Sequence, residues 1–219
     1  MKRAILLLPA ILFCTALQAA QPNLDSCVVE VICTFQENNP YLPWQTRETG
    51  SRHGFGVILD ETTVLTTENL VRNHTMVEIR KARSGEKILA EVEKADCEIN
   101  LAMLKIKPSA LPAGPAIQFA ESLPLQSDVE IFQHDDSRQV QKCQATVLKI
   151  EMSPLPKAPY DSISFSLLCN INIRGEGTPV FFNGKMAGIV MAFSPGSRTA
   201  TMLPYPVLKK FVGAARGSQ

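Results

Sequence analysis

Short apolar segments alternate with turn-forming residues along most of this chain. From about residue 25 onward, runs rich in Val, Ile, Leu and Phe recur at intervals of roughly 8–12 residues, separated by Gly, Asn, Asp and Pro. Such regular spacing is typical of an all-β sandwich or barrel. The runs expected to form strands are CVVEVICTF, GFGVILDE, TTVLTTE, TMVEIRKA, KILAEVEKA, LAMLKIK, DVEIFQHD, KCQATVLKIEM, SISFSLLC, PVFFNGKMAGIVMAF and TATMLPY.

Two segments near the C-terminal end carry more specific signals. The pair Asn183-Gly184 lies between two apolar runs and is typical of a two-residue hairpin turn, because both residues tolerate positive φ. The segment YPVLKKFVGAA instead spaces its apolar residues by three and four, as the buried face of a helix does. It predicts one short helix over about 206–214, with Pro206 at its start.

Two stretches interrupt the series of strands. Residues 36–53 form a long polar segment that contains Trp44, and we expect a loop there. Residues 108–126 contain four prolines and predict an extended linker. The linker separates two groups of strands of similar size, about 25–107 and 127–205. Two similar β-halves suggest paired barrels, with the groove between them as the natural place for a site.

The N-terminal segment has the pattern of a secretory signal peptide. Lys2 and Arg3 precede an apolar run over residues 4–16, and small residues follow at Ala19 and Ala20. The apolar run is shorter than the roughly 20 residues that a membrane helix needs. We therefore expect residues 1–20 to be removed, at a bond that the sequence leaves open, and the mature chain to be periplasmic or secreted.

Charge and histidine content argue against several functional classes. Without Lys2 and Arg3 the chain has 20 basic and 21 acidic residues, a formal charge of −1. Because this balance indicates no basic surface, we expect no nucleic-acid partner. We also expect no membrane span after the signal peptide is removed. Three histidines without Cys-x-x-Cys or His-x-x-x-His spacing predict no metal site, and we expect no cofactor.

The cysteines leave their pairing open. The exported chain would hold Cys27, Cys33, Cys97, Cys143 and Cys169. Export permits disulfides, but an odd number leaves at least one thiol free or paired between chains. Cys27 and Cys33 share one expected strand, in which six residues span roughly 20 Å, so these two should not pair with each other. Most of the cysteines are most simply interpreted as small buried apolar residues.

Three blocks in order resemble a known family. They read RHGFGVILDETTVLTTENLV, DCEINLAMLKI and INIRGEGTPVFFNGKMAGIV, and LPYPVLKKF follows near the end. They are similar to the blocks G-S-G-F-V-I…I-L-T-N-x-H-V-V, D-x-x-T-D-L-A-L-L-K-I and A-I-N-x-G-N-S-G-G-P-L of trypsin-like serine proteases of the exported bacterial HtrA branch. The resemblance extends over about 25–214. It implies two six-stranded antiparallel β-barrels followed by a short C-terminal helix.

The same resemblance identifies the positions of a catalytic triad. The histidine position falls on Asn69, whose amide cannot act as a base near neutral pH. The carboxylate position falls on Asn100, and the serine position falls on Gly177, or on Glu176 if the gap is placed differently. Because all three positions are substituted, we expect a catalytically degenerate member of the family, a pseudoprotease that is not an enzyme.

The loop around the expected serine is also altered. It consists of Gly175, Glu176, Gly177 and Thr178, and it is one residue shorter than the family's G-N-S-G-G-P. Since backbone N–H groups of that loop form the family's oxyanion hole, the deletion should distort or close it. The carboxylate of Glu176 would in addition repel an oxyanion.

Several other residues are candidates to replace the triad. They are the hydroxyl of Thr178, the imidazoles of His53, His74 and His134, the thiols of Cys143 and Cys169, and an acid pair of Glu176 with Asp135 or Asp136. His134 is the most suggestive of the histidines because two aspartates follow it. Each histidine is nevertheless more simply a surface or loop residue, and each of the two cysteines a buried one.

Three functions remain open from the sequence. In the first, the chain binds a protein or an extended peptide by adding it to an exposed strand edge, without cleaving it. In the second, it is a structural or regulatory subunit of an envelope or protease complex, in which the chain could form an oligomer. In the third, it is a serine-type endopeptidase whose catalytic residues lie elsewhere in the sequence.

Overall fold

The computed structural model describes residues 24–37, 41, 42, 44, 48–108, 117–155 and 159–217. The expected signal peptide over residues 1–20 and residues 109–116 of the expected linker lie outside the described residues. Trp44 lies within them, and its side chain is exposed to solvent. No helix of the described part is long and apolar enough to cross a membrane.

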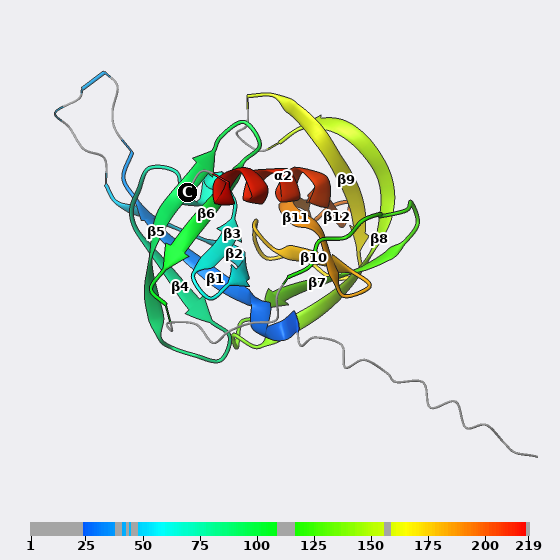
Figure 1. The fold of residues 1–219 in the computed structure, drawn as a ribbon, viewed down its shortest axis with the longest axis horizontal. Coiled ribbons are helices and arrows are strands. Elements are labelled where there is room, and N and C mark those ends of the chain that lie inside the picture. Colours follow the sequence, from blue (N-terminus) through cyan, green and yellow to red (C-terminus); the bar gives the residue numbers. More distant parts are fainter. Residues whose placement is uncertain are drawn as a thin grey trace, which may run out of the picture.

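The first half of the described chain closes into an antiparallel barrel (Figure 1). Its strands are β1 (Val28–Phe35), β2 (Gly50–Asp60), β3 (Thr63–Thr66), β4 (His74–Lys81), β5 (Lys87–Asp96) and β6 (Leu101–Ile106). They follow one another around the barrel in the order β1-β2-β3-β6-β5-β4. A single turn of 3-10 helix, η1 (Leu24–Cys27), precedes β1, and a short helix, α1 (Glu68–Val71), follows β3.

The second half repeats this architecture. Its strands are β7 (Asp128–His134), β8 (Val140–Pro154), β9 (Asp161–Cys169), β10 (Pro179–Phe182), β11 (Lys185–Ser194) and β12 (Thr199–Pro204). They close in the order β10-β11-β12-β9-β8-β7. Within the described residues the protein therefore has two closed six-stranded antiparallel barrels, and the fold predicted from the sequence is confirmed.

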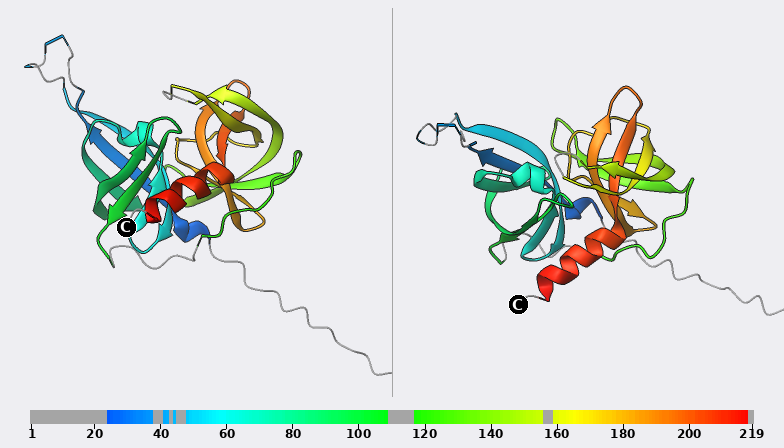
Figure 2. Two further views of the ribbon diagram at one scale, coloured as in Figure 1. Left: turned by 45° about the horizontal axis from the view of Figure 1, so that its top comes forward. Right: turned by 90° about the horizontal axis from the view of Figure 1, so that it is seen from above.

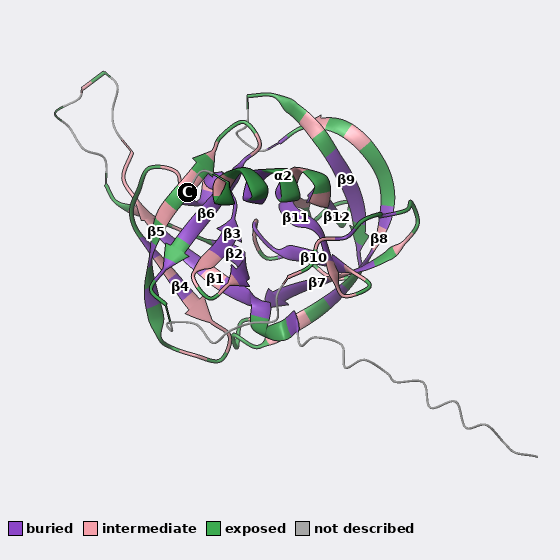
Figure 3. Cartoon of the chain, in the orientation of Figure 1, coloured by how far each residue is buried: buried purple, intermediate pink, exposed green. Residues whose placement is uncertain are grey.

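Helix α2 (Tyr205–Arg216) follows the last strand and lies across both barrels (Figures 1 and 2). Its side chains Leu208 and Phe211 are buried in the same apolar cluster as Phe55 of β2 and Phe132 of β7. Figure 3 shows that buried residues are frequent in the strands, whereas exposed residues are frequent in the turns and along α2. Because this one cluster includes residues of both barrels and of α2, it holds the two halves in a fixed relation and positions the junction between them.

Two local predictions are confirmed. Asn183 and Gly184 have φ values of 50° and 76°, as a tight turn between β10 and β11 requires. The predicted helix forms, with Pro206 in its first turn, where the missing N–H of proline leaves no bond unmade.

The prediction of a loop through residue 53 is wrong at its C-terminal end. Strand β2 begins at Gly50, and Gly50 pairs with Phe35 of β1. The guanidinium of Arg52 lies 3.7 Å from the centroid of the Phe35 ring, so this polar segment gains a packing partner from tertiary structure. The sequence also predicts a strand that extends through Glu68, whereas β3 ends at Thr66 and Glu68 begins helix α1.

Candidate functional site

The loop of residues 175–178 lies against β2 where the two barrels meet. The backbone N–H of Phe55 donates a hydrogen bond to the carbonyl of Glu176 at 2.9 Å. Gly177 has φ +82°, and a Cβ there would lie only 1.9 Å from the carbonyl oxygen of Phe55. Within the loop, Thr178 Oγ1 donates to the carbonyl of Gly175 at 2.7 Å. The shortened loop therefore approaches β2 so closely that only glycine fits at position 177.

The structure brings three of the residues singled out from the sequence together at this junction. The backbone N–H of Asn69 donates to Asn100 Oδ1 at 2.7 Å. The side-chain amide of Asn69 donates to Glu176 Oε1 at 2.6 Å. Asn100 is fully buried and has φ 55°. Gly177 lies beside them in the loop but contributes no side chain. We call Asn69, Asn100 and Glu176 the junction cluster.

The chemistry of the junction cluster is that of a structural link. Its two side-chain amides are neutral near pH 7. Its one carboxylate, that of Glu176, accepts a hydrogen bond from the amide of Asn69 and does not orient an imidazole. Asn69 belongs to α1 and Glu176 to the loop before β10, so their hydrogen bond joins barrel one to barrel two. Arg52 fixes the same helix from the other side, because its Nη1 donates to the carbonyls of Asn69 and Arg72 at 3.2 and 2.9 Å.

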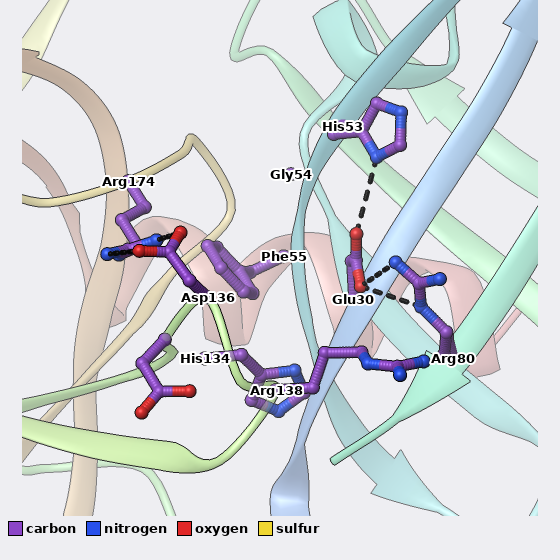
Figure 4. Close-up of a pocket in the computed structure, with 10 residues that line it drawn as sticks. Glu30, His53, Gly54, Phe55, Arg80, His134, Asp136, Arg138 and Arg174 are labelled. Atoms are coloured by element: carbon purple, nitrogen blue, oxygen red, sulfur yellow. Dashed lines mark hydrogen bonds and ion pairs between the residues drawn. The ribbon is translucent and has the colours of Figure 1, made fainter. Parts of the chain in front are cut away.

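A second group of polar residues lies on the outer face of β1, β2 and β4. Ser51 Oγ is 3.3 Å from His53 Nε2, and His53 Nδ1 is 3.3 Å from Glu30 Oε1. Arg80 donates from Nε and Nη2 to the other carboxylate oxygen of Glu30, at 2.9 and 2.7 Å. Figure 4 shows the contacts of Glu30 with His53 and Arg80. We call Ser51, His53 and Glu30 the strand triad.

The strand triad has the order of contacts that nucleophilic catalysis requires. A hydroxyl contacts one imidazole nitrogen, and a carboxylate contacts the other. The side chain of His53 is 58% exposed and that of Glu30 only 15%, so the imidazole is reachable while its carboxylate partner is shielded. Burial by itself would raise the pKa of Glu30, but the hydrogen bonds and positive charge of Arg80 and His53 lower it overall.

The backbone beside Ser51 is available as a hydrogen-bond donor. Phe55 lies opposite Glu30 on β1, yet its N–H turns away from β1 to reach the 175–178 loop. Since N–H groups alternate in direction along an antiparallel strand, those of Ser51 and His53 also point away from β1. Strand β3 pairs with β2 only from about Val57 onward, so within the described chain this edge of β2 is not covered by a strand.

A cavity of about 360 Å³ separates the strand triad from barrel two. Glu30, His53 and Arg80 line it from barrel one, and His134, Arg138 and Arg174 line it from barrel two (Figure 4). Arg174 forms an ion pair with Asp136 at its rim. The cavity combines charges of both signs and could receive polar side chains of a ligand bound along β2.

The histidines His134 and His74 and the acidic residues considered from the sequence contact groups that are not nucleophiles. His134 is buried and packs edge-on against Phe55, and burial lowers its pKa. His74 Nδ1 contacts the carbonyl of Val71 at 2.9 Å, at the end of α1. Glu176 accepts a hydrogen bond from Asn69, Asp135 accepts one from the backbone N–H of Gln139, and Asp136 pairs with Arg174, so no acid pair with Glu176 forms.

Sequence reasoning missed Ser51 and Glu30. The alternation of Ser51 and His53 at positions i and i+2 would have placed both on one face, but only if residues 50–53 had been assigned to a strand. Glu30 is 23 positions from His53, and only the pairing of β1 with β2 brings them together.

The sequence is similar to plant proteins of the Do-like group. Over 90% of the chain it is 26% identical to the mitochondrial protein Do-like 11 of Arabidopsis thaliana. It is 24% identical to the mitochondrial protease Do-like 4 over 85% of the chain, and 23% identical to the chloroplastic protease Do-like 2 over 85%. These matches cover 34%, 37% and 32% of the relatives, so the chain spans about a third of their length. No family model matches the chain.

Solved structures share the two-barrel fold. The active form of the Rv3671c protease of M. tuberculosis matches with a TM-score of 0.64 and 17% identity, over 83% of this chain and 77% of that one. The HtrA-type protease AlgW, solved with a decapeptide, matches with a TM-score of 0.68 and 16% identity, over 88% of this chain and 65% of that one.

These comparisons contradict the expectation that the chain is not an enzyme. Curated relatives are named proteases, and one structural neighbour is a protease in its active form. Substitutions at Asn69, Asn100 and Gly177 are therefore not sufficient to assign inactivity. The chain is homologous to the Do-like proteases and has the trypsin-like fold of the HtrA-type enzymes.

Proposed function

We propose that this protein is a serine-type endopeptidase that acts on extended polypeptides, with Ser51, His53 and Glu30 in the catalytic roles. The observation that carries the proposal is the continuous hydrogen-bonded order Ser51–His53–Glu30, with 3.3 Å at each step. Such contacts are often longer in a free enzyme than in its complex with substrate. The relatives named proteases support the reaction class.

Each member of the strand triad has a distinct role in this reaction. Ser51 Oγ attacks the carbonyl carbon of the scissile peptide bond, while His53 Nε2 takes the hydroxyl proton. Glu30 accepts the hydrogen bond of the other ring nitrogen and stabilises the imidazolium. The protonated His53 then gives its proton to the leaving amine, and water hydrolyses the serine ester by the same sequence of steps.

Arg80 is a positioning residue in this arrangement. Its two hydrogen bonds hold one oxygen of Glu30, which leaves the other oxygen directed at His53 Nδ1. Because these bonds favour the ionised carboxylate, Glu30 stays charged at neutral pH.

The edge of β2 supports an extended polypeptide as the substrate. A segment that adds to this edge would pair with the outward N–H groups of Ser51 and His53, in the manner of β-augmentation. The N–H of Ser51 would then also lie near the developing oxyanion. One donor in place of two costs about 10²–10³ in rate, so we expect slow turnover compared with a trypsin-like enzyme that has a complete oxyanion hole.

We also propose that the substrates lie outside the cytoplasm, because residues 1–20 have the pattern of a signal peptide. Envelope or secreted polypeptides with unfolded, extended segments are the partners that fit both this location and the open strand edge.

The test is covalent labelling with a fluorophosphonate probe that reacts with activated serines. We expect the parent protein to be labelled and to hydrolyse a fluorogenic casein. Ser51→Ala should lose both the labelling and the hydrolysis. Ser197→Ala is the matched control, because Ser197 is an exposed hydroxyl in a turn of barrel two. Absence of labelling in the parent, or labelling that survives in Ser51→Ala, would overturn the proposal.

A further inference from the structure

Two buried thiols lie side by side in barrel two, away from both polar clusters. Cys169 ends β9 and pairs with Ala145 of β8. Cys143 is two residues from Ala145 on β8, so its side chain points to the same face of the sheet. Both cysteines are buried in one apolar cluster, with exposed fractions of 0% and 2%. They are diagonal neighbours across an antiparallel pair.

The contacts of these thiols fix them against each other. The thiols of Cys143 and Cys169 are close enough for each to shift the pKa of the other. Cys143 Sγ also lies 3.0 Å from Asn170 Oδ1, and Asn170 directly follows Cys169. The same oxygen accepts the backbone N–H of Gln144 at 3.2 Å, so it ties the end of β9 to β8.

The two thiols differ in acidity. The neighbouring Cys169 thiol lowers the pKa of Cys143, and the backbone groups of Ile171 and Asn170 act in the same direction, against the effect of burial. The same contact, together with burial, raises the pKa of Cys169. Cys143 is therefore the thiol that ionises first and the better nucleophile toward a disulfide.

The other described cysteines have no such neighbour. Cys27 and Cys33 are buried in barrel one, in two different apolar clusters, and Cys97 is exposed in the turn between β5 and β6. All of the described cysteines are free thiols in this structure.

We propose that Cys143 and Cys169 are a thiol–disulfide pair, which closes into an intramolecular disulfide across β8 and β9 when the protein meets a disulfide oxidant. Disulfide geometry needs Cα atoms closer than about 6.8 Å, while diagonal neighbours lie about 7–8 Å apart. Because β9 ends at Cys169, a small shift of this last residue brings the sulfurs into range. An exported chain would meet such oxidants in its own compartment.

The exchange is balanced by one external disulfide, such as oxidised glutathione. The Cys143 thiolate attacks a sulfur of the reagent, forms a mixed disulfide and releases one glutathione thiolate. The Cys169 thiol then loses its proton and attacks Cys143 Sγ, which releases the second glutathione. Two protein thiols are oxidised and one glutathione disulfide is reduced to two thiols. Burial of both sulfurs means that the reaction should occur during folding or local opening.

The test is refolding of the full chain in an oxidised and reduced glutathione buffer, followed by alkylation and peptide mapping. We expect one linked pair of peptides, containing Cys143 and Cys169, two hydrogens lighter than the sum of the free peptides. Added dithiothreitol should lower the Tm of the linked protein by roughly 5–10 °C. Cys143→Ser should remove both effects, whereas Cys33→Ser, another buried thiol, should leave both unchanged.

Two results would overturn the proposal. One is complete alkylation of both cysteines after refolding in the oxidising buffer. The other is a link from either cysteine to Cys97, Cys27 or Cys33. If Cys143→Ser does not fold, peptide mapping of the parent alone still decides between these outcomes. The result does not depend on the proposed endopeptidase activity, because no thiol of the pair belongs to the strand triad.

Discussion

The junction cluster and the strand triad contain similar chemical groups in opposite settings. In the junction cluster, Asn69 uses its backbone and side-chain amides on Asn100 and Glu176, and the glycine of the adjoining loop admits no side chain. In the strand triad, Ser51 and His53 are exposed, and their backbone N–H groups point to the edge of β2 that no strand of the described residues covers. In the first arrangement both N–H donors of Asn69 are used within the molecule, although Asn69 Oδ1 is buried without a hydrogen-bond partner among the described residues. The second arrangement leaves a hydroxyl and an imidazole exposed to solvent.

The difference shows that residues at a family's catalytic positions need not be arranged for catalysis, and that a suitable arrangement can occur elsewhere in the fold. The junction cluster occupies the place where the trypsin-like resemblance puts a triad, yet its hydrogen bonds join the barrels. The strand triad lies on the outer face of barrel one, where Ser51 and His53 are two residues apart on β2 and the pairing of β2 with β1 brings Glu30 to His53. Four variants can break or sharpen this contrast.

The largest loss of stability should follow Gly177→Ala. A Cβ 1.9 Å from the Phe55 carbonyl, at φ +82°, cannot be accommodated without moving the loop off β2. We expect a loss of about 3 kcal/mol or more in the free energy of unfolding, measured by urea denaturation. Gly184→Ala is the control, since φ is +76° there but the space is open, and it should cost about 1 kcal/mol. Equal losses in Gly177→Ala and Gly184→Ala would show that the close approach of the loop to β2 does not contribute to stability.

Glu30→Gln should lower the rate of casein hydrolysis about 10²–10⁴-fold, measured as kcat/KM. A neutral amide cannot stabilise the His53 imidazolium and favours the wrong tautomer. Glu78→Gln is the matched control, because Glu78 lies on the neighbouring strand β4 in an ion pair with Lys87 at 2.8 Å. A similar loss of activity in both variants would mean that Glu30 acts through its negative charge on this face of barrel one and not through its hydrogen bond to His53.

Asn69→Ala should affect stability and leave the chemistry intact. It removes a 2.6 Å hydrogen bond between the barrels, which we expect to cost about 1–2 kcal/mol in urea denaturation. Fluorophosphonate labelling at Ser51 should stay within a factor of two of the parent. A loss of labelling of an order of magnitude or more would instead assign the junction cluster to the reaction.

The smallest effect concerns the pH dependence set by His134, which is buried against Phe55. Its pKa is lowered from 6.5 in the folded protein by burial, so the unfolded chain binds the proton first as pH falls. Stability should therefore decrease below about pH 6.5, by at most about 1.4 kcal/mol per pH unit. His134→Phe should flatten this part of the profile in urea titrations at pH 5 and 7.5. An unchanged slope would assign it to other groups.

Local patterns predicted most of the fold. The recurrence of apolar runs, the Asn183-Gly184 turn and the helix beginning near Pro206 each depend on neighbouring residues, so they can be recognised without the tertiary structure. The segment 50–53 could not, because its side chains are polar and its strand conformation depends on pairing with β1. The site was missed for the same reason: Ser51 looked like a loop residue.

The sequence by itself determined two antiparallel β-halves and the blocks that resemble the trypsin-like proteases, since periodicity and turn chemistry are local. Tertiary structure alone decided which polar groups meet. Asn69 and Glu176 are 107 positions apart and His53 and Glu30 are 23 apart, so their contacts depend on barrel closure and strand register. Chain distance says nothing about such contacts, because hydrogen bonds depend on separations of about 3 Å in space.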